Sequence, residues 1–400
     1  MTLLTAHTPA EPTPLHPQRP LNGLRVIEEG AFITGPYAAM LLADMGADVI
    51  KVERPGTGDA FRSYDGTLYA STFRGLNHNK RSISIDHKDE GDRRVFDELI
   101  ATADVYLHNF RPGVAERLGI DAERLLAINP RLVHCSISGL GSDGPYAGRP
   151  AYDTVAQALS GMLSMTLDPS QPRISGPATA DAVTGMYAAN GILAALVRRS
   201  LDGRGHVVGI SMLEAMTHFL SEPYASYFAS GERPGPYSRA AVSQSFAMTC
   251  SDGARIALHL SSPERFWIGL LHAVAREDLA ADPRFDSRAR RVENHEQLRV
   301  ELQKAFQTHP RDHWLPPLAE HDVPHAPVLE PDEALADPQV THLRIQVESH
   351  HPTEGLVRSI RPPHSFDGRI DTDVLAPPTL GEHDDEIREE LRALREGPSR

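Results

Sequence analysis

Two aspartates stand where a carboxylate could act on a substrate. Asp181 lies in the segment 178–186 (ATADAVTGM), at the start of a long apolar stretch, and Asp153 follows Tyr152 after a glycine-rich turn at 139–145. An ionised carboxylate can attack an activated carbonyl carbon and form a covalent intermediate. Each aspartate could equally be a helix N-cap, because its side chain accepts hydrogen bonds from free backbone N–H groups.

Basic side chains gather after one of the predicted strands. Phe110 and Arg111 belong to the segment 109–113 (NFRPG), and Arg117 follows shortly after. The carboxyl ends of parallel strands form the edge at which α/β sheets bind ligands. An aromatic ring and guanidinium groups suit an adenine ring and phosphates. The same residues could also be ordinary solvated surface cations.

An alternation of strands and helices must position these residues. Residues 24–27 predict a strand, 30–36 a turn, 37–45 a helix and 47–53 a second strand, which together form a βαβ unit. The alternation continues with strands at 81–86, 104–108, 132–138 and 206–211 and helices at 93–101, 121–128, 181–199 and 212–229. The first half of the chain is therefore predicted to be a doubly wound, Rossmann-like α/β domain.

The character of the chain changes after residue 230. Stretches at 231–237 and 324–337 are predicted to be linkers, and helices at 266–276 and 295–307 with a hairpin turn at 250–255 predict a smaller α+β domain. The predicted organisation is a disordered leader at 1–20, a large domain at 21–225, a small domain at 226–330 and a C-terminal segment at 331–400 that returns to the large domain.

The composition narrows the class of function. A formal net charge of −14 disfavours nucleic-acid binding, so an anionic ligand would need a local basic patch. No segment is predicted to span a membrane, and the absence of a signal peptide favours the cytoplasm. Cys135 and Cys250 are too few for a disulfide scaffold. The 20 histidines show no metal-binding spacing and are interpreted as surface residues.

The turn at 30–36 lies between a strand and a helix, where nucleotide phosphates bind in many α/β proteins. It lacks both the G-x-G-x-x-G spacing and the lysine of a P-loop. Glu53 ends the second strand, where a dehydrogenase carries its ribose-binding carboxylate. Dinucleotide binding therefore stays open beside the alternative of a tight turn that serves helix packing.

Seven segments, taken together, resemble the class III CoA-transferases of the CaiB/BaiF type. This family includes formyl-CoA transferase, carnitine CoA-transferase and 2-methylacyl-CoA racemase. The segments that carry the resemblance are 21–28, 35–59, 77–86, 103–119, 129–146, 151–161 and 181–199. Their combined order and spacing are specific, although no single segment is.

The resemblance implies a CoA-transferase that moves CoA from an acyl-CoA to a small carboxylic acid, with Asp181 as the nucleophile. It implies an interlocked homodimer, and the reaction requires no metal or redox cofactor. Tyr152 and Asp153 match positions beside the nucleophile. The implied CoA-binding residues are Arg54, Ile85, Asp86, His87, Lys88, Asn109, Phe110, Arg111 and Arg117.

Two alternatives remain beside a transferase. A racemase of the same family carries a histidine before its aspartate, where this chain has Tyr152. Histidine is a good base near neutral pH, whereas tyrosine ordinarily titrates near ~10, so Tyr152 favours transfer. The second alternative is a non-catalytic protein that binds CoA or a dinucleotide.

Overall fold

A computed structural model describes residues 19–396, which form two compact units. The first unit contains the chain up to Met162, residues 174–221 and residues 343–396, and the second contains Leu163–Arg173 and Glu222–His342. Most of the predicted leader lies outside the described residues.

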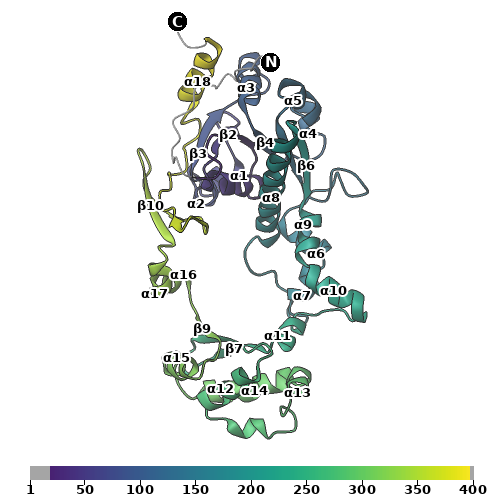
Figure 1. Cartoon of the computed structure of the whole chain (residues 1–400), viewed down its shortest axis with the longest axis vertical. Coiled ribbons are helices and arrows are strands. Elements are labelled where there is room, and N and C mark those ends of the chain that lie inside the picture. Colours follow the sequence, from purple (N-terminus) through teal and green to yellow (C-terminus); the bar gives the residue numbers. More distant parts are fainter. Residues whose placement is uncertain (1–18, 397–400) are drawn as a thin grey trace, which may run out of the picture. The chain divides into compact units, whose positions relative to one another are not determined.

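The first unit is built on a parallel sheet with the strand order β3-β2-β1-β4-β5-β6 (Figure 1). The strands are β1 (Arg25–Glu29), β2 (Asp48–Glu53), β3 (Lys80–Ser84), β4 (Val105–His108), β5 (Val133–Ser138) and β6 (His206–Ser211). The order reverses between β1 and β4, and this switch point is where ligands bind in open α/β sheets. The predicted α/β class and the parallel sheet are confirmed.

Helices cover both faces of this sheet (Figure 1). On one face α1 (Thr34–Asp44) and α8 (Thr179–Asp202) pack together over Val26 and Val105. On the other face α3 (Glu90–Thr102), α5 (Ala122–Ile128) and α18 (Asp384–Glu396) cover Ile27 and Tyr106. Successive side chains of a strand point to opposite faces, which explains why neighbours such as Val26 and Ile27 enter different cores.

Helix α8 is long and apolar enough, by length and composition alone, to cross a membrane. The prediction that no segment meets this criterion was therefore wrong. Ala188, Ala189 and Ile192 of this helix are nevertheless buried in the core shared with α1 and the sheet. Small alanine side chains permit that close packing, and α8 is the central helix of the first unit.

The second unit contains an antiparallel sheet of β7 (Ser245–Thr249), β8 (Arg255–His259) and β9 (His325–Val328). Helices α12 (Glu264–Ala273), α14 (His295–Phe306) and α15 (Arg311–Glu320) enclose a core with Trp267 and Trp314. The hairpin predicted at 250–255 is present. The linker predicted at 324–337 is wrong, because β9 pairs with β8 there; proline is tolerated in β9 because it is an edge strand.

The remaining elements are shorter. In the first unit they are η1 (Ala60–Ser63), α2 (Ser71–Arg74), α4 (Val114–Leu118), α6 (Asp153–Leu159), α9 (Met212–Phe219), β10 (Gln346–His351), β11 (Gly355–Ile360), β12 (Ser365–Phe366) and β13 (Arg369–Ile370). The others are α7 (Met162–Thr166), α10 (Ser221–Ser230), α11 (Ser238–Ser243), η2 (Glu277–Ala280), α13 (Arg288–Glu293), α16 (Pro331–Ala336) and α17 (Pro338–His342). The single helix predicted at 212–229 is divided at Leu220 into α9 and α10.

Several histidines that were expected at the surface are buried. They are His78, His108, His134 and His351. His78 contacts the carboxylate of Asp44, with Nε2 2.8 Å from Oδ1, and His351 contacts Glu382 at the same distance. Composition cannot reveal such partners, because they come from distant parts of the chain.

Candidate active site

The loops that follow β1 and β4 are tied together at the switch point. Asn109, directly after β4, accepts a hydrogen bond from Ala31 N at 3.0 Å through Oδ1. Its Nδ2 donates to Ala31 O at 2.7 Å and to Thr34 Oγ1 at 2.9 Å. Asn109 therefore fixes the turn at 30–34 from the neighbouring strand.

Helix α8, which carries Asp181, packs against α1 where this turn ends. Asp181 lies in the first turn of α8, and Gly185 follows four residues later on the same face. A Cβ at Gly185 would come within 2.9 Å of Tyr37 Cδ1 and 3.0 Å of Thr34 O. Glycine thus permits α8 to approach the start of α1 one helical turn from Asp181.

Asp153 is tied to the start of α8. Its Oδ1 accepts hydrogen bonds from Ala180 N at 2.8 Å and Asp181 N at 3.4 Å, and its Oδ2 accepts from Gln157 Nε2 at 2.6 Å. The N-cap positions belong to Tyr152 in α6 and Ala178 in α8, so neither aspartate caps its own helix. Instead Asp153 caps α8 from the neighbouring helix α6, and the two acidic residues become neighbours.

The environment of Asp181 favours its protonated form. Burial, followed by the nearby charge of Asp153, raises the pKa of Asp181 from 3.8 to about 7. Within residues 19–396 Asp181 forms no ion pair that would offset these effects. Strongly shifted carboxyl groups in accessible positions are typical of functional sites.

Cations surround the carboxyl edge of the sheet. Arg54 follows β2, Lys88 follows β3, and Arg111 and Arg117 follow β4. All of these side chains are exposed, and none forms an ion pair within the part of the chain that the structure describes. Unpaired cations at the edge where an α/β sheet binds ligands are available to an anionic ligand.

Residues 21–384 match the family described as CoA-transferase family III. The chain belongs to this family. It is 36% identical to the acetyl-CoA:oxalate CoA-transferase of Acetobacter aceti over 357 residues, which cover 85% of this chain and 88% of the relative. It is 30% identical to the succinyl-CoA:glutarate CoA-transferase of Mus musculus, over 95% of this chain and 88% of the relative.

Solved structures agree with the family assignment. The crystal structure of a CaiB/BaiF family protein from Brucella suis aligns with a TM-score of 0.83 and 34% identity, covering 93% of this chain and 99% of that one. The predicted resemblance is confirmed, and the chain is a CoA-transferase that moves CoA between an acyl-CoA and a carboxylic acid. The relatives act on different acids.

The other predicted residues of the transferase occupy varied environments. Ile85 is buried in the core, so only its backbone could reach a ligand. His87 Nε2 lies 2.6 Å from Glu29 Oε1, and exposed Asp86 accepts a hydrogen bond from Lys88 N. Phe110 is half-buried and stacks on His108 with 5.2 Å between the ring centroids. The side chains of His87, Asp86 and Phe110 therefore make contacts within the loops of the predicted ligand site.

A row of aromatic rings beside Asp153 was missed by the sequence analysis. Phe32 contacts Phe61 and Tyr152 edge to face, with ring centroids 5.4 and 5.8 Å apart, and Phe61 contacts Tyr64 at 4.9 Å. Tyr152 is 57% exposed, so one end of the row is open to a ligand. Phe32, Tyr64 and Tyr152 lie outside the regular elements and Phe61 lies in the short helix η1, so no periodic pattern could have marked the row.

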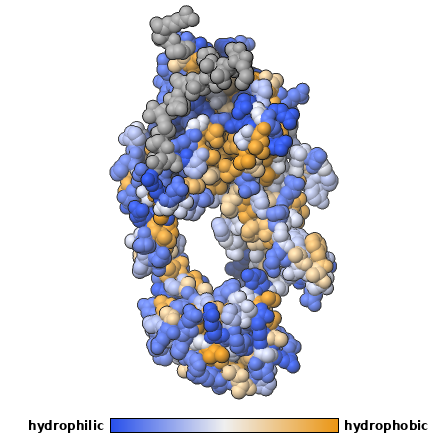
Figure 2. All heavy atoms as spheres, in the orientation of Figure 1, coloured by the Kyte–Doolittle hydropathy of each residue, from blue (hydrophilic) through white to orange (hydrophobic). Residues whose placement is uncertain are grey.

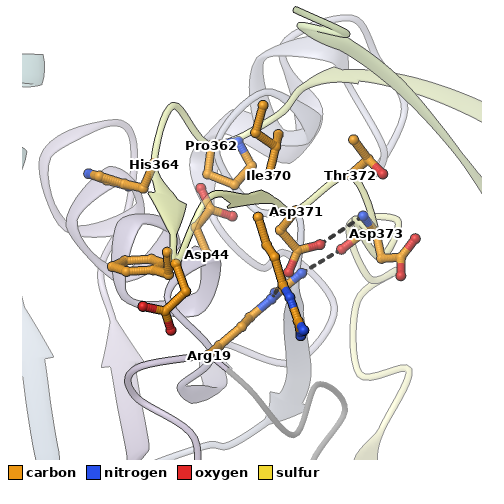
Figure 3. Close-up of a pocket in the computed structure, with 11 residues that line it drawn as sticks. Arg19, Asp44, Pro362, His364, Ile370, Asp371, Thr372 and Asp373 are labelled. Atoms are coloured by element: carbon orange, nitrogen blue, oxygen red, sulfur yellow. Dashed lines mark hydrogen bonds and ion pairs between the residues drawn. The ribbon is translucent and has the colours of Figure 1, made fainter.

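A separate cavity of about 620 Å³ lies in the first unit (Figure 3). Its lining includes Asp44, the last residue of α1, and therefore belongs to the opposite edge of the sheet from the turn at which α1 begins. Figure 3 shows Arg19 directed toward Asp371 and Asp373, with which it forms an ion pair and a hydrogen bond. None of the predicted site residues lines this cavity.

Proposed function

We propose that this transferase exchanges CoA through covalent intermediates on Asp181. The supporting observation is the environment of Asp181: a largely buried carboxyl group that forms no ion pair within residues 19–396, on a helix that packs against the start of α1. An ionised carboxylate in such a place is poorly solvated and is therefore a reactive nucleophile. Above pH 7 most of the Asp181 population carries the charge that the reaction requires.

The exchange proceeds by acyl substitutions that conserve atoms and charge. The Asp181 carboxylate attacks the thioester carbonyl, and the C–S bond breaks to give a mixed anhydride and CoA thiolate. The thiolate attacks the aspartyl carbonyl and releases the donor carboxylate, leaving an aspartyl-CoA thioester. The acceptor carboxylate then attacks this thioester, and the released thiolate attacks the new acyl carbonyl. These steps form the product acyl-CoA and restore Asp181.

Two backbone N–H groups at the start of α8, those of Ala180 and Asp181, already donate hydrogen bonds. Asp153 accepts from both Ala180 N and Asp181 N, so these donors are not free to stabilise the oxyanion of a tetrahedral intermediate. We propose that Tyr152 and Asp153 shape the acyl pocket and hold the start of α8. The oxyanion donors then come from other backbone groups at the site.

We propose that CoA binds along the basic edge. Arg54, Arg111 and Arg117 neutralise its phosphates, and Phe110, Asn109 and the loop formed by Ile85, Asp86, His87 and Lys88 form the adenosine site. The unpaired, exposed state of the cations supports this placement in a protein with an overall negative charge. The two acid substrates are small carboxylic acids.

The proposed steps use only a carboxylate and thiolate chemistry, so we propose that no metal or redox cofactor takes part. Extensive dialysis against a chelator should leave the rate of exchange unchanged. We also propose a cytoplasmic location, because both cysteines, Cys135 and Cys250, are unpaired thiols, as is usual in a reducing compartment. Cell fractionation tests this proposal.

We propose that the enzyme is an interlocked homodimer. Figure 2 shows apolar surface over the part of the first unit that holds α8. On α8 itself, Val197 and Leu201 are exposed. Phe219 of α9 and Phe228 of α10 are exposed as well. Exposed apolar groups of this kind are typical of protein–protein contacts. Sedimentation at low concentration should detect only dimers, and an active monomer would contradict the proposal.

Replacing Asp181 with alanine tests the proposed nucleophile. Asp181→Ala should lower the rate of CoA exchange by roughly 10⁴-fold or more, because no other group forms the anhydride. Binding of CoA, measured by calorimetry, should persist. Asp286→Ala removes an exposed aspartate of the second unit and serves as the matched control with unchanged exchange. Near-normal exchange by Asp181→Ala would refute the mechanism.

A racemase on the same fold would use Asp181 to move a proton. The raised pKa of Asp181 suits that chemistry also, so the two reactions need a direct comparison. Incubation of a 2-methylacyl-CoA in D₂O without an acceptor acid should leave the α-carbon unlabelled. Deuterium incorporation there at catalytic rates would favour the racemase.

A further inference from the structure

Four charged side chains form a buried cluster beneath the turn at 30–32. Lys51 Nζ lies 3.0 Å from Glu28 Oε1 and 3.1 Å from Asp59 Oδ2, and Lys80 Nζ lies 3.2 Å from Glu28 Oε2. None of these side chains has any exposed surface. The contact between Lys51 and Asp59 Oδ2 is an ion pair without hydrogen-bond geometry. Two carboxylates face two ammonium groups, so the cluster has no net charge.

The two ammonium groups favour the ionised form of Glu28. Burial alone would raise the pKa of Glu28, but Lys51 and Lys80 outweigh burial and hold the pKa below its ordinary value. Removal of one member would leave an unpaired charge in the core, which is more harmful than removal of an oppositely charged pair. The cluster can therefore be dissected with single and paired substitutions.

The cluster holds the backbone of the turn. Lys51 Nζ donates to Gly30 O at 2.8 Å, Gly30 N donates to Glu28 Oε1 at 2.8 Å, and Phe32 N donates to Asp59 Oδ1 at 3.0 Å. Phe32 has a φ of 64°, a left-handed conformation that side chains other than glycine rarely adopt. The ion cluster supplies contacts that keep Phe32 in this unfavourable conformation.

A chain of contacts leads from the turn to the nucleophile. The ring of Phe32 contacts the ring of Tyr152 with 5.8 Å between centroids, and Tyr152 is the N-cap residue of α6. The next residue, Asp153, accepts a hydrogen bond from Asp181 N. Displacement of Phe32 would therefore remove one of the supports of the paired carboxyl groups.

We propose that Lys51 and Asp59 are positioning residues for the transferase: they fix the 30–32 turn and, through Phe32 and Tyr152, the carboxyl pair of Asp153 and Asp181. They act through other residues and contact no substrate. This inference goes beyond the proposed function and rests on it because CoA exchange is the measured activity. Substitutions in the cluster should therefore change kcat independently of their effect on Tm.

A charge-balanced double variant tests the proposal. Lys51→Met alone should lower Tm sharply, and Lys51→Met combined with Asp59→Asn should regain most of that loss, because the cluster again has no net charge. The double variant loses the tether to Gly30 O, so kcat should stay at least about tenfold below wild type. KM for acyl-CoA should change less than about threefold, because the basic edge is intact. Recovery of kcat together with Tm would overturn the proposal.

The matched control is a partly buried ion pair that does not contact the turn. Arg199 Nη2 lies 2.8 Å from Asp104 Oδ1 at the end of α8 that is opposite Asp181. Arg199→Met combined with Asp104→Asn should lower Tm to a comparable extent but leave kcat within about twofold of wild type. An equal loss of kcat in this control would show that general destabilisation explains the effect.

Phe32→Ala keeps the proposal testable if the double variant does not fold. It leaves all four charges in place, so Tm should change little while kcat falls at least about fivefold. Phe32→Tyr, which retains the ring, should keep kcat near wild type. Unchanged kcat in Phe32→Ala would contradict the proposal. Failure of the proposed function looks different, because Asp181→Ala would then remain active whatever these variants do.

Discussion

Two groups of acidic side chains lie near the carboxyl edge of the same sheet, and they differ in their compensation by cations. Glu28 is paired with Lys51 and Lys80, which hold its pKa below the ordinary value despite burial, and Asp59 is paired with Lys51. Asp153 and Asp181 have each other and backbone N–H groups as neighbours, and burial together with mutual repulsion raises the pKa of Asp181 to about 7. Burial therefore has opposite outcomes at neighbouring places in one fold.

Under the proposed mechanism, the comparison separates a structural carboxylate from a reactive one. A cation within ion-pair distance neutralises Glu28, which serves to hold the chain. Asp181 has no such partner in residues 19–396, so its charge is available to attack a carbonyl carbon. Polarity and burial alone would not distinguish these two groups.

The largest expected effect is on the stability of the balanced cluster. Lys51→Met leaves Glu28 and Asp59 with one ammonium group fewer, and breaking a buried pair from one side costs about 3–5 kcal/mol. Urea denaturation at pH 7 measures the free energy of unfolding. A loss below about 1 kcal/mol would show that Lys51 does not compensate these carboxylates.

Asp181→Asn should raise the free energy of unfolding, whereas Lys51→Met lowers it. The folded-state pKa of about 7 lies above the ordinary 3.8, so ionisation of Asp181 favours the unfolded chain as pH rises between these values. Asparagine removes this penalty and should stabilise the protein at pH 8 by at most about 4 kcal/mol. The gain should shrink below pH 7 and vanish near pH 4. Destabilisation at pH 8 would contradict the raised pKa.

The exposed cations of the basic edge form a third group, which pairs with no acidic side chain within the described chain. Arg117→Ala should raise KM for acyl-CoA about tenfold, the value of one charge-assisted contact, while kcat changes little. Arg265→Ala, at an exposed position of the second unit, is the control with unchanged kinetics. A loss confined to kcat would place Arg117 elsewhere in the reaction.

The smallest of the expected effects is that of Asp153→Asn on the pH dependence of kcat/KM. Its amide oxygen can still accept the hydrogen bonds from α8, but the negative charge beside Asp181 is gone. The pKa of Asp181 should fall, and the acid limb of the kcat/KM profile should move to lower pH by less than about one unit, because burial is the larger cause of the shift. A move to higher pH would show that Asp153 does not repel Asp181.

Much of the fold follows from periodicity in the sequence. The strand, turn, helix and strand of residues 25–53 were predictable because buried strands and an apolar helix alternate over short spacings. The break at Leu220 and the strand β9 were not, since both depend on tertiary contacts that override local preference. Long-range partners likewise decide which histidines are buried.

The sequence predicted candidate site residues by resemblance, but it could not predict their geometry. Asp181 was assigned by resemblance, and the structure explains the glycine four residues later as the point where α8 meets α1. The cap that Asp153 provides for α8 could not be foreseen. It joins Asp153 to Ala180 and Asp181, which are 27 and 28 positions further along the chain, and no local pattern links residues so far apart. Lys51 inside an apolar strand was a signal of buried pairing that the sequence analysis did not use.

Trapping the covalent intermediate tests the central claim most directly. The enzyme is incubated with an acyl-CoA at pH 8, quenched with hydroxylamine and digested, and the peptides are analysed by mass spectrometry. The account predicts a hydroxamate on Asp181, produced also in Asp153→Asn and absent from Asp181→Asn. A hydroxamate on Asp153, or rapid CoA exchange without modification of Asp181, would contradict it.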